Sequence, residues 1–576
     1  MSKLNIDQKN VKSLFQDSKS IFLIPDYQRP YAWGLEECKT LWEDLFSFAF
    51  PNDNYDNFNS NDEYFLGPIV LFKNENGKME IIDGQQRLTT LMILLRGFYN
   101  KLGFMQDQNS QAMKTDIEKC LWKADMFGKY KKDDLKINSE VATDNDKEEF
   151  LSILKDGDNK NMKSKYSENF NFFKRQIEDF SSKYPTYFAY FPAIILNNCV
   201  LLPIEAESQD TALRIFSTLN DRGKPLSDAD IFKAQLYKYY TTLGEKEIFI
   251  SKWKELESIA NKIFHPTNGS PLDELFTRYM YYERAKMGIK SSTTESLRKF
   301  YERNNYSLFK NKTTLANLEQ LVSFWQDINN QDEFRFSKRI LRCLYILNAA
   351  PNGMWTYIVS VYFMQNKNTD GTLEEQEFFK FLNIITAFIW AYALTNPGVN
   401  SLRTPIYAEM IKIVNGNNIT FEDFKFEEKR FRSMFSNYAF TNNRAITKSM
   451  LTWWAFTFDG QELLSLETQF DIEHIYSKGR QQKESGLTDP QSIELLGNKS
   501  LLERRINIRA SDYRFEDKIK YYEGFNTKKG TQIDELFHIY SKLKQFTEKE
   551  ISDRNQAIID KFIKYLNDNN LLKEIE

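Results

Sequence analysis

The chain has 576 residues, more than a single hydrophobic core usually serves, so we expect two or three domains. Its 41% hydrophobic, 15% aromatic and 27% charged residues exclude a disordered chain. Because the formal net charge is only −3, any surface that binds nucleic acid must come from local clusters of Lys and Arg.

The four cysteines form no CxxC pair, which is typical of a reducing cytoplasm and excludes a zinc knuckle built from cysteines. No apolar N-terminal segment is followed by a cleavage site. The longest apolar stretch, residues 381–394, is too short to span a bilayer. We therefore expect a cytoplasmic protein with no membrane partner, in which this stretch forms a buried helix.

Residues 1–240 mix β-type runs with helical patterns and are expected to form the first domain. Runs rich in β-branched and aromatic residues indicate its strands. The predicted elements are strands at 21–25, 64–72, 78–83 and 199–206, and helices at 85–99 and 211–219, with a turn at 220–223 after the second helix.

Two motifs of this domain predict a phosphate site: IPDYQRPYAW at 24–33 and IDGQQRLTTL at 82–91. Asp83 and Gly84 end a strand with a tight turn. The helix begins at Gln85, and the free backbone N–H groups of its first turn can bind a phosphate. Arg87 can add a bidentate contact to the same phosphate. Arg29 can add a second positive charge if the fold brings it alongside, and Asp83 can hold Mg²⁺ or polarise a water.

Gln28 and Gln86 complete the predicted nucleotide-binding set. The alternative is an ordinary first turn of a helix, whose polar side chains cap their neighbours. Tyr27 and Trp33 can stack on a base or line a pocket that senses a DNA modification. A role in the core is equally open for these two aromatic residues.

Residues 241–445 show long apolar patterns with a period of 3.6 and few strand candidates. Helices are predicted at 336–347 and 355–364, without a detectable repeat. This region is expected to be a helical connector or scaffold.

The pattern changes again in residues 446–576, the third expected domain. Short strands are predicted at 470–475 and 499–502, separated by a polar loop with Gly479 and Gly486. A helix is predicted to begin near Asn507.

His474, one of three histidines, lies at the end of the first of these strands. Histidine is the usual general base for activating water, and an acidic neighbour can hold Mg²⁺ through oxygen ligands. Asn498 and Asn507 offer a carbonyl oxygen for a metal and an amide donor for a phosphate. These three residues are expected to converge and to hydrolyse a phosphodiester.

Basic residues gather in the same region and are candidates for contacts with DNA, Arg504 and Arg505 foremost. A solvated helix face balanced by nearby acidic residues is an equally open interpretation. The cluster comprises Lys499, Arg504, Arg505, Arg509, Arg514, Lys518 and Lys520.

DIEHI at 471–475, LGNKSLLERRIN at 496–507, Phe515 and Lys518 together resemble the HNH-type ββα-metal nuclease domain at the C-terminus of GmrSD-type modification-dependent restriction enzymes. The resemblance implies a catalytic set of His474, Asn498, Asn507 and Lys518.

In that set His474 is the general base and Asn507 a ligand of Mg²⁺ or Mn²⁺. Asn498 orients His474 or the scissile phosphate. Glu473 or Asp471 completes the metal site, and we favour Glu473.

The chain departs from the family pattern at two positions. Ser477 stands where the family often has Pro, and Lys499 follows Gly-Asn where the family often has Leu. Neither change removes a functional atom, but together they motivate an alternative in which cleavage has been lost.

The N-terminal motifs, together with FSTLNDRGKPLS at 216–227 and Asp230, resemble the ParB/sulfiredoxin-like N-terminal domain of the same group. This resemblance implies hydrolysis of a nucleoside triphosphate and sensing of modified DNA. The expected fold is thus α+β and predominantly helical, with a ParB/sulfiredoxin-like α/β domain, a helical middle region and a ββα-metal (HNH-like) C-terminal domain.

The sequence therefore predicts an anti-phage endonuclease that couples nucleotide hydrolysis to metal-dependent cleavage of modified phage DNA. The alternative is a nucleotide-switched DNA-binding regulator or scaffold with an inactive nuclease domain. An RNA substrate and assembly into a homo-oligomer are left open.

Overall fold

A computed structural model describes residues 5–17, 21–141, 144–158, 163–208, 211–212, 215, 227–396, 398, 400–526 and 529–574. The chain divides into two compact units, residues 1–255 (unit 1) and residues 256–576 (unit 2). The fold is α+β, with 60% of the residues helical, as the sequence predicts.

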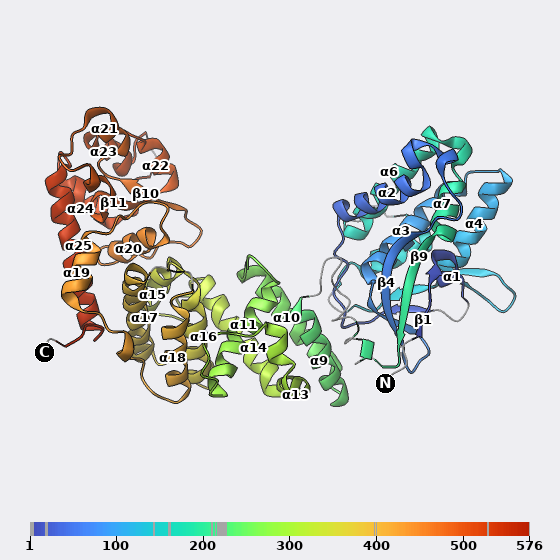
Figure 1. Cartoon of the computed structure of the whole chain (residues 1–576), viewed down its shortest axis with the longest axis horizontal. Coiled ribbons are helices and arrows are strands. Elements are labelled where there is room, and N and C mark those ends of the chain that lie inside the picture. The colour runs from blue at the N-terminus through green and yellow to red at the C-terminus, as the bar shows by residue number, and fades with distance from the viewer. Residues whose placement is uncertain are drawn as a thin grey trace. The chain divides into compact units, whose positions relative to one another are not determined.

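Unit 1 is built on a mixed sheet whose strands run in the order β1-β9-β4-β5-β3-β8, with β2 also paired to β9 (Figure 1). The pairs β4–β9, β3–β5 and β3–β8 are parallel, whereas β4–β5 is antiparallel. The four predicted strands are confirmed. The strands are β1 (Asn5–Ile6), β2 (Lys9–Asn10), β3 (Phe22–Ile24), β4 (Tyr64–Lys73), β5 (Met79–Asp83), β8 (Ile137–Ser139) and β9 (Cys199–Ala206), with a separate hairpin of β6 (Trp122–Ala124) and β7 (Tyr130–Leu135).

Helix α3 (Gln85–Leu102) is the central helix of unit 1, and the helix predicted at 85–99 is confirmed. It is buried along nearly its whole length because it packs against α4, α5 and α6. The other helices of the unit are α1 (Val11–Gln16), α2 (Leu35–Ala49), α4 (Gln108–Leu121), α5 (Lys147–Asp156), α6 (Lys165–Lys183), α7 (Tyr190–Asn198) and α9 (Asp228–Thr242), with 3-10 turns η1 (Pro51–Asp53), η2 (Tyr55–Asn57) and η3 (Pro185–Tyr187).

The predicted turn at 220–223 lies outside the described residues, as do 216–226 of the third family motif and most of the predicted helix at 211–219. The end of that motif is described. The Ser227 hydroxyl caps α9, and the Asp230 carboxylate accepts from the Ser227 backbone N–H at 3.0 Å. These two residues therefore start a helix with a capping box.

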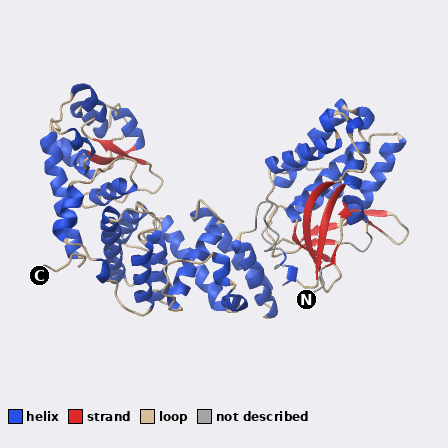
Figure 2. Cartoon of the chain, in the orientation of Figure 1, coloured by secondary structure: helices blue, strands red, loops and turns tan. Residues whose placement is uncertain are grey.

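Helix α10 (Lys246–Ile263) crosses the boundary between the units. The part of unit 2 before β10 consists mainly of helices joined by loops (Figure 2), and both helices predicted there are confirmed. They are α11 (Pro271–Lys286), α12 (Leu297–Tyr301), α13 (Arg303–Tyr306), α14 (Lys312–Asn329), α15 (Lys338–Asn348), α16 (Met354–Asn366), α17 (Glu375–Thr395), α18 (Arg403–Val414), α19 (Glu428–Ser436) and α20 (Ala445–Ala455), with η4 (Ser307–Phe309) and η5 (Glu422–Phe424).

Helix α17 contains the longest apolar stretch. By length and composition it is able to cross a membrane, but 61% of its apolar window is buried inside the protein. It packs against α15, α19, α20 and α25. It is therefore a core helix of unit 2, as predicted, and the expected domain boundary at 445/446 lies inside this compact unit.

The last part of unit 2 holds the predicted strand pair. β10 (Phe470–His474) and β11 (Lys499–Glu503) are antiparallel, with His474 opposite Lys499. The predicted polar loop instead contains a helix, because the Ser477 hydroxyl caps it at Arg480. The following helix starts directly after β11 and not near Asn507. The remaining elements are α21 (Lys478–Glu484), η6 (Pro490–Glu494), η7 (Leu496–Asn498), α22 (Arg504–Ala510), α23 (Phe515–Glu523), α24 (Asp534–Lys542) and α25 (Glu548–Asp568).

Candidate active site

His474 ends β10, and its side chain is only 14% exposed. The ring atom Nε2 lies 3.8 Å from Glu494 Oε2, beyond hydrogen-bonding distance. Within the part of the chain that the structure describes, this buried nitrogen has no hydrogen-bond partner. A buried polar atom without a partner costs free energy, and such atoms are often kept for a functional reason.

The surroundings of His474 disfavour its charged form. Burial, and after it the nearby ammonium groups of Lys499, Lys518 and Lys478, together lower the pKa of the imidazole to about 4, against the opposing effect of Glu494. The ring is therefore neutral at pH 7. A neutral imidazole can accept a proton from water, and Lys478, whose side chain is 55% exposed, favours an anion such as a phosphodiester nearby.

Lys499 and Glu494 form an ion pair beside His474. The fully buried Lys499 ammonium donates to Glu494 Oε2 at 2.6 Å and to the backbone oxygen of Phe440 at 2.5 Å. Burial raises the pKa of Glu494, but hydrogen bonds from Lys478 and Lys499 outweigh it and lower that pKa to about 2. Lys499 departs from the family pattern, and its side chain takes part in the site by binding Glu494. Glu494 was missed because a lone glutamate in a polar segment carries no signal.

Asn498 holds the chain that follows His474. Its side-chain oxygen accepts from the Tyr476 N–H at 2.7 Å, and its amide donates to the backbone oxygens of Tyr476 and Ile493, both at 3.1 Å. The backbone oxygen of Asn498 accepts from the Ile475 N–H at 2.9 Å. The fully buried Asn498 side chain therefore positions the loop after His474 through these main-chain hydrogen bonds.

Glu473 points to the opposite face of β10, as expected for adjacent residues of a strand. Its Oε1 accepts from Lys518 Nζ at 2.7 Å and from the Tyr522 hydroxyl at 2.6 Å. The Lys518 ammonium also donates to the His474 backbone oxygen at 2.6 Å. With side chains 1% and 4% exposed, Lys518 and Glu473 form a sealed ion pair that positions His474 through its main chain.

The predicted metal ligands do not come together as a free site. Glu473 is held by Lys518, and Asp471 accepts three hydrogen bonds of 3.1–3.2 Å from the Arg504 guanidinium. Asn507 lies partly buried within α22. In the described ranges no three His, Cys, Asp or Glu side chains cluster as a metal site. As arranged, these residues do not fit Mg²⁺ or Mn²⁺, because cations of the protein already neutralise both carboxylates.

The two arginines predicted to contact DNA lie on the surface. Arg504 is 55% exposed and paired with Asp471, and Arg505 is exposed at the start of α22. Both are accessible to a polyanion, and their contact with DNA stays a prediction.

In unit 1 the two predicted motifs lie together. Gln85 Nε2 donates to Gln28 Oε1 at 3.1 Å, and Gln86 Oε1 accepts from the backbone N–H groups of Ala32 and Trp33 at 2.6 and 3.3 Å. The tandem glutamines therefore fasten residues 28–33 to the start of α3. Their side chains bind the protein itself, as in the alternative of a helix start that caps its neighbours.

Charged groups meet at the same helix start. Burial raises the pKa of Asp83, whereas the Gly84 N–H and the guanidinium groups of Arg87 and Arg29 oppose that rise. Gly84 has φ +90°, and a Cβ there would lie 2.5 Å from Ile69 Cγ2, so only glycine fits. Arg29 is thus near Asp83, as a phosphate site requires.

Tyr27 lies in a small core cluster of unit 1, and its role in sensing DNA stays a prediction. It is 5% exposed, its hydroxyl donates to Glu80 Oε2 at 3.2 Å, and its ring packs against Tyr237 at 5.3 Å. Trp33 is partly buried against the main core of unit 1. The packing alternative therefore describes Tyr27, because its ring fills space between β-sheet and helix.

Comparison with known proteins gives two matches. Residues 11–237 match the model of the GmrSD restriction endonuclease N-terminal domain, and residues 425–561 match that of the GmrSD restriction endonucleases C-terminal domain. The second match includes His474 and Asn498. No curated protein matches the chain. The chain therefore belongs to the family of GmrSD restriction endonucleases, whose substrate is DNA.

Proposed function

We propose that this protein cleaves phosphodiester bonds of DNA at a site centred on His474. The observation that carries the proposal is the buried His474 Nε2, which is neutral, lacks a hydrogen-bond partner among the described residues and is surrounded by lysines. Such a nitrogen is poised to take a proton from water. The family match supports the reaction class.

The residues around His474 have different proposed roles. The exposed ammonium group of Lys478 attracts the anionic phosphodiester, and His474 Nε2 accepts a proton from the attacking water. Asn498 and Lys518 hold the main chain on either side of the imidazole ring. No cation is assigned a step, because the carboxylates expected to bind one are already paired; a requirement for Mg²⁺ or Mn²⁺ stays a prediction.

Unit 1 is proposed to bind and hydrolyse a nucleoside triphosphate and to couple it to cleavage of modified phage DNA. Arg29, Asp83 and Arg87 at the start of α3 support this, because a helix N-terminus with two guanidinium groups favours phosphate. The four free, buried cysteines suit a reducing cytoplasm, where anti-phage defence acts.

Cleavage of modified phage DNA and matched unmodified DNA by the full chain tests this proposal. Each DNA is incubated with Mg²⁺, Mn²⁺ or a chelator, with and without each nucleoside triphosphate. We expect cleavage of modified DNA alone, stimulated by nucleotide. Equal cleavage of both DNAs would remove the sensing role, and binding without cleavage under all conditions would favour the inactive regulator.

A further inference from the structure

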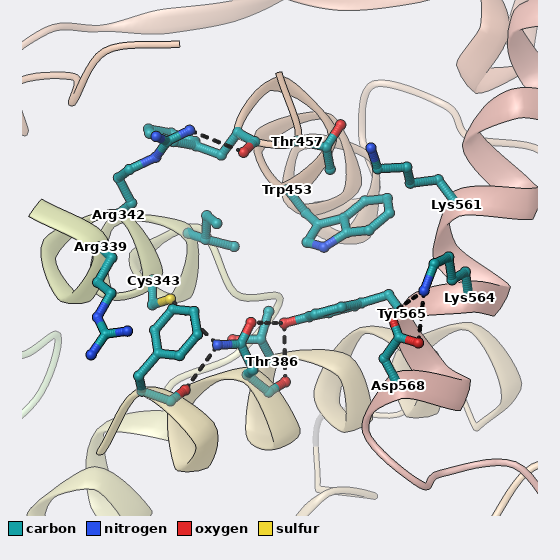
Figure 3. A pocket seen from close by; sticks show the side chains of 14 residues that line it. Arg339, Arg342, Cys343, Thr386, Trp453, Thr457, Lys561, Lys564, Tyr565 and Asp568 are labelled. Carbon is teal, nitrogen blue, oxygen red and sulfur yellow. Dashed lines mark hydrogen bonds and ion pairs between the residues drawn. The ribbon is translucent and has the colours of Figure 1, made fainter. Parts of the chain in front are cut away.

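Unit 2 contains a pocket of about 380 Å³ between the helical region and the C-terminal part (Figure 3). The residues that line it come from α15, α17, α20 and α25 and from the segment just after α20. Its volume lies within the range of sites for small molecules, roughly 300–1,000 Å³.

One wall of the pocket is aromatic. The rings of Trp453 and Tyr565 lie 5.5 Å apart at an interplanar angle of 36°, so they form adjoining panels of one surface (Figure 3). Phe379 and Phe456 extend the apolar lining. The Tyr565 hydroxyl donates to the Asn383 backbone and side-chain oxygens, both at 3.0 Å, which fixes its ring. A fixed aromatic surface of this kind favours stacking of a planar ring.

The rim is cationic. Arg339 is paired with Glu375 and Lys564 with Asp568, the one carboxylate among the described lining residues. Arg342 donates to the backbone oxygens of Phe456 and Phe458 at 3.2 and 3.3 Å. Across the ranges that the structure covers, neither Arg342 nor Lys561 has a carboxylate within 4.0 Å. Two positive charges thus remain available to an anion.

We propose that this pocket binds a nucleotide, with the base against Trp453 and Tyr565 and the phosphate at the cationic rim, which carries Arg342 and Lys561. A planar ring joined to a negative charge matches both features of the lining. The nucleotide is either free in solution or extruded from bound DNA; the second source rests on the proposed action on DNA.

Helix α25 connects the pocket to the candidate active site. Its last turns carry Lys561 and Tyr565, whereas the Arg554 guanidinium, nearer its middle, donates to the Leu496 and Gly497 backbone oxygens at 2.7 and 2.8 Å. These precede Asn498, which holds the loop after His474. A nucleotide in the pocket therefore contacts the helix that supports the active-site loop.

The test uses the full chain in a chelator, so that binding is measured without metal-dependent cleavage. The probes are AMP and GMP, measured by calorimetry, and two labelled duplexes that differ by a single bulged nucleotide, measured by anisotropy. A bulged nucleotide costs little to extrude, so a pocket for it raises the ratio of bulged to paired affinity. Because binding is the readout, failure of the His474 proposal leaves this test intact.

Two variants alter the pocket, one by its charge and one by its volume. Lys561→Glu reverses a charge at the rim, and Ile346→Trp adds bulk to the lining without removing a core side chain. Lys549→Glu makes the same charge change at an exposed lysine at the start of the same helix and serves as the control. Thermal unfolding of all three checks that they are folded.

We expect both pocket variants, but not the control, to lower either the nucleotide affinity or the ratio of bulged to paired affinity by about tenfold. This is the effect of losing about 1.4 kcal/mol of binding free energy. Weaker AMP or GMP binding assigns the pocket to a free nucleotide. A lower ratio of bulged to paired affinity assigns it to an extruded one. If neither quantity differs from that of the control variant, the proposal is wrong.

Discussion

At the scale of single residues, the His474 ring is tuned by burial and by its lysine neighbours. An exposed imidazole has a pKa near 6.5, whereas here burial and the neighbouring lysines together lower the pKa to about 4. The protein therefore holds a proton acceptor that stays neutral across the physiological range. Of the lysines that keep it neutral, the exposed Lys478 can also attract the phosphodiester.

This pKa shift makes the stability of the fold depend on pH. Because the folded-state pKa of His474 is lowered, its contribution is fully present above about pH 6.5 and is lost as the pH falls towards 4. The loss is about 3 kcal/mol. Urea unfolding at pH 7 and pH 4 should show a smaller decrease for His474→Asn than for the natural protein. Equal decreases would mean that His474 is not desolvated.

The Glu473–Lys518 ion pair predicts a large cost for removing one partner. Lys518→Met leaves the Glu473 carboxylate buried and unpaired, which should destabilise the protein by about 3–5 kcal/mol. Combining it with Glu473→Gln should restore most of the loss in urea unfolding. A Lys518→Met protein of natural stability that cannot cleave would instead place Lys518 in contact with substrate.

At the scale of elements, α25 supports the active-site loop through a close approach at Gly497. A Cβ on Gly497 would lie 1.9 Å from the Ile551 backbone oxygen, so no side chain fits between the loop and the helix. Arg554 and Asn555 then hydrogen-bond the same segment. The rigidity of the loop after His474 is therefore built on a helix that lies far along the sequence.

Gly497→Ala should accordingly separate α25 from the loop. We expect a loss of stability of about 3 kcal/mol from overpacking, together with reduced DNA cleavage. Gly353→Ala is the matched control, since a Cβ there meets open space, and its effect should be below about 1 kcal/mol. Thermal unfolding and cleavage rates of the two variants check this expectation. Similar behaviour of both would show that the loop can move away from α25.

Elements with a strong apolar pattern were predictable from the sequence, and others were not. β4 and α3 carry enough apolar side chains to reveal their period. By contrast, α21 has no buried residue to give such a signal, and its start depends on the Ser477 cap. The start of α22 was misplaced because β11 runs directly into it.

In the candidate site, residues within a motif were predictable from the sequence, whereas contacts that depend on folding were not. The family motifs identified His474 and Asn498, because their spacing along the chain is what the motif records. They did not indicate that Lys518 already neutralises Glu473, since that contact depends on how α23 packs against β10. The motifs did not indicate Glu494 either, because its proximity to His474 arises only in the folded chain.

At the scale of the whole molecule, the two family matches lie in different compact units. The N-terminal match falls within unit 1 and the C-terminal match within unit 2. The helices between the matches are not a separate body in unit 2, because α15 and α17 pack against α20. The candidate nuclease site is therefore built on a helical support that is larger than the matched domain.

A single substitution tests whether His474 performs the cleavage of DNA. The cleavage rate of modified DNA is measured for the natural chain, for His474→Ala and for His265→Ala, which removes an exposed histidine elsewhere in unit 2. We predict that His474→Ala is at least about 100-fold slower, the usual effect of losing a general base, while His265→Ala cleaves at the natural rate. A His474→Ala protein that is folded, binds DNA and cleaves it as fast as His265→Ala would show that His474 is not the general base.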